Sequence, residues 1–207
     1  MDSIAADADV FTREYLNALT TALSNLNVET IAKISETLWE AYQNDRQIFF
    51  FGNGGSAASA SHIVTDLTKG ALGHRGDAPA RPIRAISLTD NLPLLTAWAN
   101  DVGYEAVFLG QLRTYLRPGD VVVAISASGN SPNVIQAVRY ARETGAIVIS
   151  LTGFGGGTLA PLADLGIIVD SNHYGIVEDA HMQIGHVFCY YFRQRITSNV
   201  TLETAPR

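Results

Sequence analysis

The feature that most constrains the fold is a series of short apolar runs, separated by loops and by stretches with helical periodicity. The apolar runs lie at residues 48–51, 83–88, 121–125, 147–151 and 165–169. Helices are predicted at about 57–69, 104–115, 132–144 and 176–196. Most of the runs are almost continuously apolar, which is typical of parallel strands covered on both faces. The alternation therefore predicts an α/β fold: a five-stranded parallel sheet flanked by helices, doubly wound and flavodoxin-like.

The region before the first strand carries a different pattern. Residues 7–44 show helical periodicity, with apolar side chains such as Ile34 and Leu38 recurring at three- and four-residue steps. Asn27 is suited to cap the second of two helices. We therefore expect a single domain, 1–207, with three parts. They are an N-terminal helical hairpin over 1–45, an α/β core over 46–197 and a flexible polar tail over 198–207.

Composition and charge exclude several classes of protein. With 207 residues, 47% of them hydrophobic, the chain can bury a full core without cross-links. Cys189 is the only cysteine, which excludes a disulfide scaffold and a cysteine-based zinc finger. The net charge of -6 argues against a nucleic-acid partner, and no apolar run is long enough to span a membrane. The acidic N-terminus has no signal-peptide pattern, so we expect a cytoplasmic protein.

Two loops rich in glycine and serine each join a predicted strand to a predicted helix. Their sequences are GNGGS at 52–56 and SASGNS at 126–131. In the second loop, Ser131 is suited to cap the following helix and Pro132 to occupy its first position. Free N–H groups at a helix N-terminus, together with serine hydroxyls, suit a phosphate dianion. Because ligands of doubly wound sheets bind beyond the carboxyl ends of the strands, the two loops predict a phosphate site.

The sequences of these loops allow two other interpretations. Gly52, Gly54 and Ala57 fit a loose dinucleotide-binding fingerprint, but the acidic residue expected about 20 positions later is absent. We therefore expect no nucleotide cofactor. The loops could also be tight turns with helix caps and no ligand, but two of them in one sheet favour phosphate binding. The third glycine run, at 155–157, has no serine cluster and is interpreted as a turn.

Titratable side chains on two predicted helices form the second candidate constellation. His62 and Asp66 lie about 40° apart on one helix face, and the last helix carries Glu178, Asp179, His181 and His186. Such residues could bind a divalent metal, transfer protons, or form only solvated ion pairs. Spacing leaves the partner of His186 open, since Asp179 is about 20° from it around the helix and Glu178 about 80°.

Four segments resemble a known family. They are GNGGSAASASHIVTDLTKG at 52–70, AND at 99–101, ISASGNSPNV at 125–134 and VEDAHMQIGH at 177–186. Together they are similar to the sugar isomerase (SIS) family, and most similar to its bacterial phosphoheptose isomerase branch. The resemblance covers about residues 7–195. It implies an aldose–ketose isomerase that interconverts sedoheptulose 7-phosphate and D-glycero-D-manno-heptose 7-phosphate. It also implies a homotetramer with active sites at subunit interfaces and one zinc ion per subunit.

The resemblance also implies roles for individual residues. Those assigned to the substrate are Asn53, Gly54, Gly55, Ser56, Asn100 and Asp101, with Ser126, Ala127, Ser128 and Ser131 at the phosphate. Those assigned to the metal are His62, Asp66, Glu178 and His186. Asp66 and His186 are the expected base and acid of proton transfer through an enediol, with Glu178 as an alternative base.

The chain departs from the family at several of these positions. Asp66 and Glu178 stand where Glu and Gln are usual, Ala127 replaces a hydroxyl residue, and Lys69-Gly70 replaces a Gly-Arg pair. Three alternatives therefore stay open: a non-catalytic SIS protein that binds a replication-initiation partner, a phosphosugar sensor, or an isomerase of another sugar phosphate. Retention of His62, Asp66 and His186 favours an enzyme.

Overall fold

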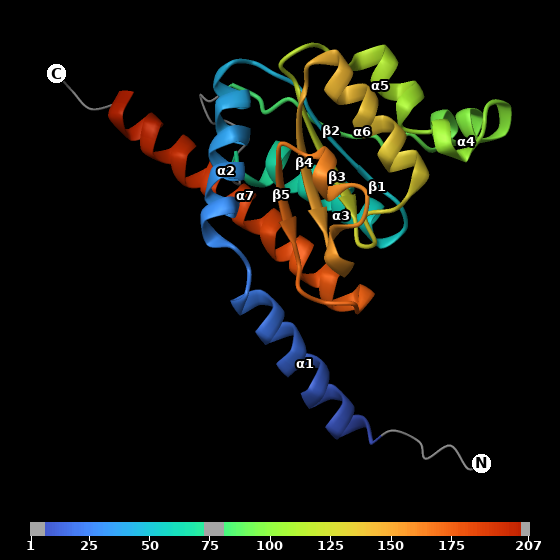
Figure 1. Ribbon diagram of the computed structural model, residues 1–207. Helices are drawn as coiled ribbons and strands as arrows, with labels where there is room; N and C mark the ends of the chain where they lie inside the picture. The colour runs from blue at the N-terminus through green and yellow to red at the C-terminus, as the bar shows by residue number, and fades with distance from the viewer. Residues whose placement is uncertain (1–6, 73–80, 204–207) are drawn as a thin grey trace.

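The computed structural model describes residues 7–72 and 81–203. Its sheet has the predicted five parallel strands, in the order β2-β1-β3-β4-β5 (Figure 1). The strands are β1 (Ile48–Gly52), β2 (Ala85–Ser87), β3 (Val121–Ser126), β4 (Ile147–Thr152) and β5 (Leu165–Ile168). This order is the flavodoxin-like one, in which the direction of winding reverses between β1 and β3. The predicted doubly wound fold is therefore confirmed.

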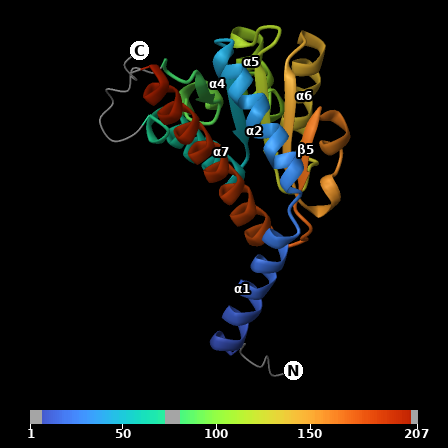
Figure 2. The same ribbon diagram turned by 90° about the vertical axis from the view of Figure 1, so that its left-hand side faces the viewer.

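Helices cover both faces of the sheet because neighbouring residues of each strand point to opposite faces (Figures 1 and 2). Phe50 and Val123 point toward one apolar cluster, shared with the helices α2, α3 and α7. Phe49 and Val122 point toward a second cluster, shared with α5 and α6. Every residue of β1 and β3 is buried, as expected for central parallel strands.

The helices of the core follow the predictions except where noted below. Their bounds are α3 (Gly55–Thr65), α4 (Leu92–Asp101), α5 (Leu109–Tyr115) and α6 (Pro132–Thr144), with a π-helical segment, Asp66–Gly70, directly after α3. The helix predicted at 104–115 is split, because a 3-10 turn at Tyr104–Ala106 precedes α5. The helix α4 was not predicted. It buries no residue fully, and apolar residues occupy most of its positions, so its sequence shows no contrast between an apolar and a polar face. Asn91 caps it by accepting from the Leu94 N–H at 3.1 Å.

The N-terminal helices α1 (Ala8–Ser24) and α2 (Val28–Gln43) do not form the expected hairpin. The two views show α1 leaving the body of the molecule, while α2 lies along the sheet (Figures 1 and 2). The cause is the apolar face of α1, where Leu19 and Ala22 pack against the beginning of α7 rather than against α2. The predicted cap of α2 is confirmed, since Asn27 accepts from the Thr30 N–H at 2.8 Å.

The last helix, α7 (Tyr174–Glu203), has 30 residues and continues beyond the predicted end. The expected flexible tail over 198–207 is therefore helical up to Glu203, and its last four residues lie outside the described part. In this polar stretch the Ser198 hydroxyl donates to the Gln194 carbonyl oxygen one turn earlier at 2.9 Å. Among the described residues, no helix combines the length and the apolar character needed to cross a membrane.

Candidate active site

The two glycine–serine loops lie side by side at the carboxyl edge of the sheet. They follow β1 and β3, which pair in parallel with Gly52 opposite Ile125. This is the point where the winding of the sheet reverses and where doubly wound folds bind ligands. A side chain at Gly52 would lie 2.5 Å from the Ile125 carbonyl oxygen, so only glycine lets the first loop leave the strand this closely.

The second of these loops, residues 126–131 and called the serine loop below, turns sharply between β3 and α6. Ser126 is buried, whereas Ser128 and Ser131 are partly open to solvent. The Ser131 hydroxyl lies 3.3 Å from that of Ser126 and makes no capping bond to α6, so the expected side-chain cap is not formed. Pro132 begins the helix as predicted. The Ser131 hydroxyl is therefore not used by a cap, whereas the Val134 N–H in the first turn of α6 is bonded to Asn133 Oδ1 at 3.0 Å.

The third glycine run supports the serine loop, a role that the sequence prediction missed. The Gly153 N–H donates to the Ala127 carbonyl oxygen at 2.8 Å, and Asn130 accepts from the Thr158 N–H at 3.0 Å. Gly157 has φ +54°, and a Cβ there would lie 2.5 Å from the Ser128 carbonyl oxygen. Consecutive glycines after a strand were the available signal, because they permit this close backbone approach.

Asn53 connects the first loop to the neighbouring elements. Its side-chain amide exchanges hydrogen bonds of 2.9 and 2.8 Å with that of Asn133 at the start of α6. The Tyr104 hydroxyl donates to Asn53 Oδ1 at 3.0 Å. Neither Asn133 nor Tyr104 was predicted as a site residue. Their bonds hold the Asn53 amide between the two loops.

Asn100 and Asp101 lie at the end of α4, on the other side of the sheet from α7. The Asn100 amide donates to the Asp101 carboxylate at 2.8 Å. Within residues 7–72 and 81–203, no hydrogen bond connects either side chain to the serine loop. The described part of the chain thus shows no hydrogen bond that ties these two predicted substrate residues to that loop.

Three of the predicted titratable residues meet between α3 and α7. His62 and His186 have their Nε2 atoms 3.4 and 3.6 Å from Asp66 Oδ2, and the two rings are 5.3 Å apart in an edge-on arrangement. The potential ligand atoms of all three lie within 4.8 Å of one another. A cavity of about 510 Å³ opens at this cluster, and Lys69 and Arg193 also line it.

The spacing of this cluster fits a zinc ion. Ligands at about 2.0–2.2 Å from a tetrahedral zinc ion are themselves about 3.4 Å apart. The two nitrogen–oxygen distances at Asp66 Oδ2 are 3.4 and 3.6 Å, close to that separation. Two imidazoles and one carboxylate leave the fourth position of a tetrahedral ion open to a substrate oxygen, as in catalytic zinc sites.

The fourth predicted metal residue, Glu178, lies apart from these three. Its carboxylate sits directly over Gly55 at the beginning of α3, where any side chain would collide with it. The positive end of the α3 dipole favours an anionic carboxylate at this position. The neighbouring Asp179 instead accepts from the Tyr15 hydroxyl of α1 at 2.8 Å. Glu178 rather than Asp179 thus faces the glycine loop, which the angular spacing alone did not indicate.

Two further titratable groups near the cluster are held in their neutral forms. Burial lowers the pKa of His181 to about 4, and its Nε2–H donates to the Thr152 carbonyl oxygen at 3.2 Å. Burial raises the pKa of the Cys189 thiol to about 11, with the negative charge of Asp66 adding to the effect. This thiol donates to the Asp66 carbonyl oxygen at 3.2 Å. His181 and Cys189 are therefore suited to packing and positioning rather than to proton transfer.

The helices that carry the cluster cross in close contact. A Cβ at Gly185 of α7 would overlap the side chain of Ile63 of α3. The glycine therefore lets the two helices approach more closely than any other residue would. His62 directly precedes Ile63, and His186 directly follows Gly185. The helix crossing therefore sets the distance between the two imidazoles.

Comparisons with known proteins agree with this fold and site. A family model of the SIS domain matches residues 13–153. The chain is 40% identical over 159 residues to the phosphoheptose isomerase of Rhodospirillum rubrum, a match that covers 77% of this chain and 82% of that protein. It is 37% identical over 168 residues to the phosphoheptose isomerase of Aquifex aeolicus, covering 81% and 85% respectively.

Solved structures give the same relationship. The phosphoheptose isomerase of Neisseria gonorrhoeae superposes with a TM-score of 0.80 at 33% identity, over 90% of this chain and 96% of that one. The phosphoheptose isomerase of Francisella tularensis superposes with a TM-score of 0.83 at 26% identity, over 91% and 100%. The sheet order and the site at its carboxyl edge define a doubly wound α/β protein of the sugar isomerase class. The chain belongs to the SIS domain family.

Proposed function

We propose that this protein is an aldose–ketose isomerase that interconverts sedoheptulose 7-phosphate and D-glycero-D-manno-heptose 7-phosphate. The observation that carries the proposal is the contact of Asp66 with both His62 and His186 at an open cavity. The names of the relatives support the substrate, and the serine loop supports binding of its phosphate.

The reaction moves a proton between C1 and C2 of the sugar through an enediol. It needs a base at carbon and an acid at oxygen that exchange roles during the reaction. In the absence of a metal, Asp66 and His186 are the proposed pair, because their side chains adjoin and both line the cavity. When these two side chains hold a metal they are ligands, and the role of base passes to Glu178. Glu178 is the alternative base, because its carboxylate lies beside the glycine loop where the sugar is expected.

Substrate contacts are proposed on both sides of this pair. The phosphate binds to Ser126, Ser128, Ser131 and the backbone at Ala127. The sugar lies along the first loop, at Asn53, Gly54, Gly55 and Ser56. Asn100 and Asp101 complete the sugar site.

We propose a zinc ion as the cofactor, held by His62, Asp66 and His186. When bound, zinc polarises the carbonyl group of the sugar and stabilises negative charge on its oxygen. Glu178 lies outside this set and fits the role of base better than that of a fourth ligand. No nucleotide cofactor is included in the proposal.

We also propose assembly as a homotetramer in the cytoplasm, with active sites at subunit interfaces. The support is the exposed apolar surface of α1, where Val10, Phe11 and Leu16 are 50%, 56% and 54% exposed. Helix α1 projects from the body in both views, so these side chains are accessible to another subunit (Figures 1 and 2).

The proposed reaction is tested by incubating the full chain with sedoheptulose 7-phosphate in D₂O, with and without a chelator. The expected result is an aldose product that carries deuterium at C2, with a slower reaction after metal removal. Bound but unconverted and unlabelled sugar would contradict the proposal and indicate a sensor or scaffold protein. Conversion of a different sugar phosphate alone would contradict the substrate but not the reaction.

A further inference from the structure

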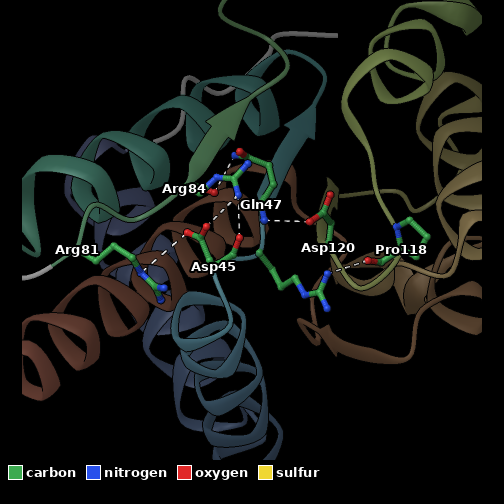
Figure 3. Close-up of polar contacts among 7 residues, drawn as sticks. Asp45, Gln47, Arg81, Arg84, Pro118 and Asp120 are labelled. Atoms are coloured by element: carbon green, nitrogen blue, oxygen red, sulfur yellow. Dashed lines mark hydrogen bonds and ion pairs between the residues drawn. The ribbon is translucent and has the colours of Figure 1, made fainter.

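A second cavity lies at the amino edge of the sheet, away from the candidate active site. It has a volume of about 270 Å³ and is lined by residues from the beginnings of β1 and β3 and from the segment before β2. Figure 3 shows the polar contacts around it. The strand β1 has five residues and separates the two edges by about 16 Å. A small ligand in this cavity therefore cannot reach the serine loop.

Positive charge dominates the lining. Arg46, Arg84 and Arg117 all line the cavity, against Asp45 and Asp120. The Asp120 carboxylate accepts from two backbone N–H groups, those of Gln47 at 3.0 Å and Arg117 at 2.8 Å. The Asp120 carboxylate thus joins the segment before β1 to the segment before β3. It forms no ion pair with a guanidinium group within the described part of the chain.

Within the described part of the chain, two of the three guanidinium groups form no ion pair. Arg84 lies 3.5 Å from an Asp45 carboxylate oxygen, and Arg81 approaches the other oxygen at 3.9 Å (Figure 3). Arg46 donates to the Pro118 carbonyl oxygen at 3.2 Å, and Arg117 donates to its neighbour's carbonyl oxygen at 3.1 Å. In residues 7–72 and 81–203, neither has a carboxylate within ion-pair distance. The charges of Arg46 and Arg117 are therefore available to a bound anion.

The backbone around these arginines is fixed in unusual conformations. Asp45 has φ +55°, which is rare for a residue other than glycine. This conformation directs its carbonyl oxygen to Arg84, which donates to it at 2.8 Å. Gly119 has φ +84°, and the Arg46 guanidinium lies flat against it, 3.0 Å from where a Cβ would be. Arg84 and Arg46 thus each contact one of these two turns.

We propose that this cavity binds a nucleoside monophosphate. Guanidinium groups bind phosphate oxygens through pairs of parallel N–H donors, so Arg46 and Arg117 suit a phosphate dianion. Tyr115 and Ile86 line the same cavity and are 46% and 39% exposed, which offers an apolar surface to a planar base. Pockets for drug-sized ligands measure about 300–1,000 Å³. This cavity, at about 270 Å³, lies just below that range, so it suits a ligand no larger than a mononucleotide.

The test is calorimetric titration of the full chain with AMP, with inorganic phosphate and with sedoheptulose 7-phosphate. AMP is expected to bind, with an affinity that falls as salt is added. Arg46→Gln and Arg117→Gln should each weaken AMP binding by about tenfold or more, since each removes a charged donor. Arg142→Gln, an exposed arginine on α6 that pairs with Asp164, is the matched control and should leave it unchanged.

A second pair of variants separates this cavity from the serine loop. Ser126→Ala with Ser128→Ala should weaken sedoheptulose 7-phosphate binding and leave AMP binding unchanged. Arg117→Lys keeps the charge and should retain part of the AMP affinity, which guards against a folding defect in Arg117→Gln. The proposal is overturned if the wild-type chain does not bind AMP. It is also overturned if the serine variants, rather than the arginine variants, abolish AMP binding, or if inorganic phosphate binds as tightly as AMP.

Discussion

At the scale of single residues, Asp66 occupies the central place in the candidate site. Its Oδ2 atom contacts both His62 and His186, and no other carboxylate among the described residues does so. Asp66→Asn keeps the shape of the side chain but removes its charge and its ability to accept a proton. We expect kcat to fall by about 10²–10⁴-fold, while sugar-phosphate binding is nearly unchanged.

Steady-state kinetics and equilibrium binding measured on the same preparation check this expectation. Glu143→Gln, which neutralises an exposed carboxylate on α6, is the control and should behave like the wild type. A near-normal kcat in Asp66→Asn would shift the role of base to Glu178.

His181 predicts how the stability of the fold depends on pH. Its pKa is about 4 in the folded chain and 6.5 in the unfolded one, because burial disfavours the charged ring. Between these values the unfolded chain binds a proton that the folded chain does not. The free energy of unfolding should therefore decrease by up to about 3 kcal/mol as the pH falls from 6.5 to about 4.

Urea unfolding across this range measures the dependence. His181→Gln removes the titrating group and can still donate to Thr152, so its stability should change less with pH. His173→Gln, which replaces an exposed histidine, should keep the wild-type dependence. Parallel losses in the wild type and His181→Gln would show that other groups cause the acid sensitivity.

At the scale of elements, the glycine turn after β4 shapes the serine loop. Gly157→Ala would place a Cβ 2.5 Å from the Ser128 carbonyl oxygen. Gly155→Ala is the matched control, because Gly155 also has a positive φ but has open space around it. In both variants alanine is forced to a positive φ, so the free energy of unfolding should fall in both. Only Gly157→Ala should also weaken sugar-phosphate binding, by displacing the loop.

Thermal unfolding and binding titrations on the two variants separate these effects. Equal affinities in Gly155→Ala and Gly157→Ala would mean that the glycine turn does not shape the phosphate site.

The close crossing of α3 and α7 gives a second prediction at this scale. Alanine normally stabilises a helix by about 1 kcal/mol relative to glycine. At Gly185 the added methyl group would overlap Ile63 and push the helices apart. Gly185→Ala should therefore lower stability and weaken zinc binding, since His62 and His186 would separate. Adding Ile63→Ala should restore part of both, which zinc titration and urea unfolding can measure. No recovery in the double variant would contradict this explanation.

The sequence could predict most of the sheet, because its central strands are continuously apolar and buried on both faces. The edge strand β2 is shorter than its apolar run. Helix α4 was missed because apolar residues occupy most of its positions, which leaves no polar face to reveal a helical period. The N-terminal hairpin was wrong because periodicity shows that a helix has an apolar face but not what that face contacts.

The candidate site likewise contains residues that the sequence could predict and residues that it could not. His62, Asp66 and His186 were predicted, and the structure brings them together between two helices. The place of Glu178 over Gly55 could not be predicted, because it depends on how α7 crosses α3. The support from Asn133 and Tyr104 likewise comes from segments far along the chain from Asn53.

At the scale of the whole molecule, α1 is the element least supported by its own chain. Replacing Phe11 and Leu16 by Asp should leave the helical content unchanged, because both side chains are exposed. If α1 packs against other subunits, the double variant should lose the tetramer, because burying two carboxylates is costly.

Light scattering after gel filtration measures the mass. The wild type is expected at four times the 22.2 kDa of one chain, and the variant at a smaller multiple. Val28→Asp, at an exposed position on α2, is the control and should remain tetrameric. A monomeric wild type, or a tetrameric double variant, would contradict the proposed role of α1.

The close contact between α3 and α7 at Gly185 also places the two ends of the site at different distances from the helix crossing, which would act as the pivot of any relative rotation. His186 adjoins the pivot, whereas Glu178 lies seven residues, or about 10 Å, away along α7. A rotation of about 5° about the pivot would move Glu178 by about 1 Å relative to Gly55, at the 1.5 Å rise per residue of a helix. The same rotation would leave the histidine pair almost undisturbed. A change in the crossing angle would thus alter the loop end of the site more than its metal-binding end.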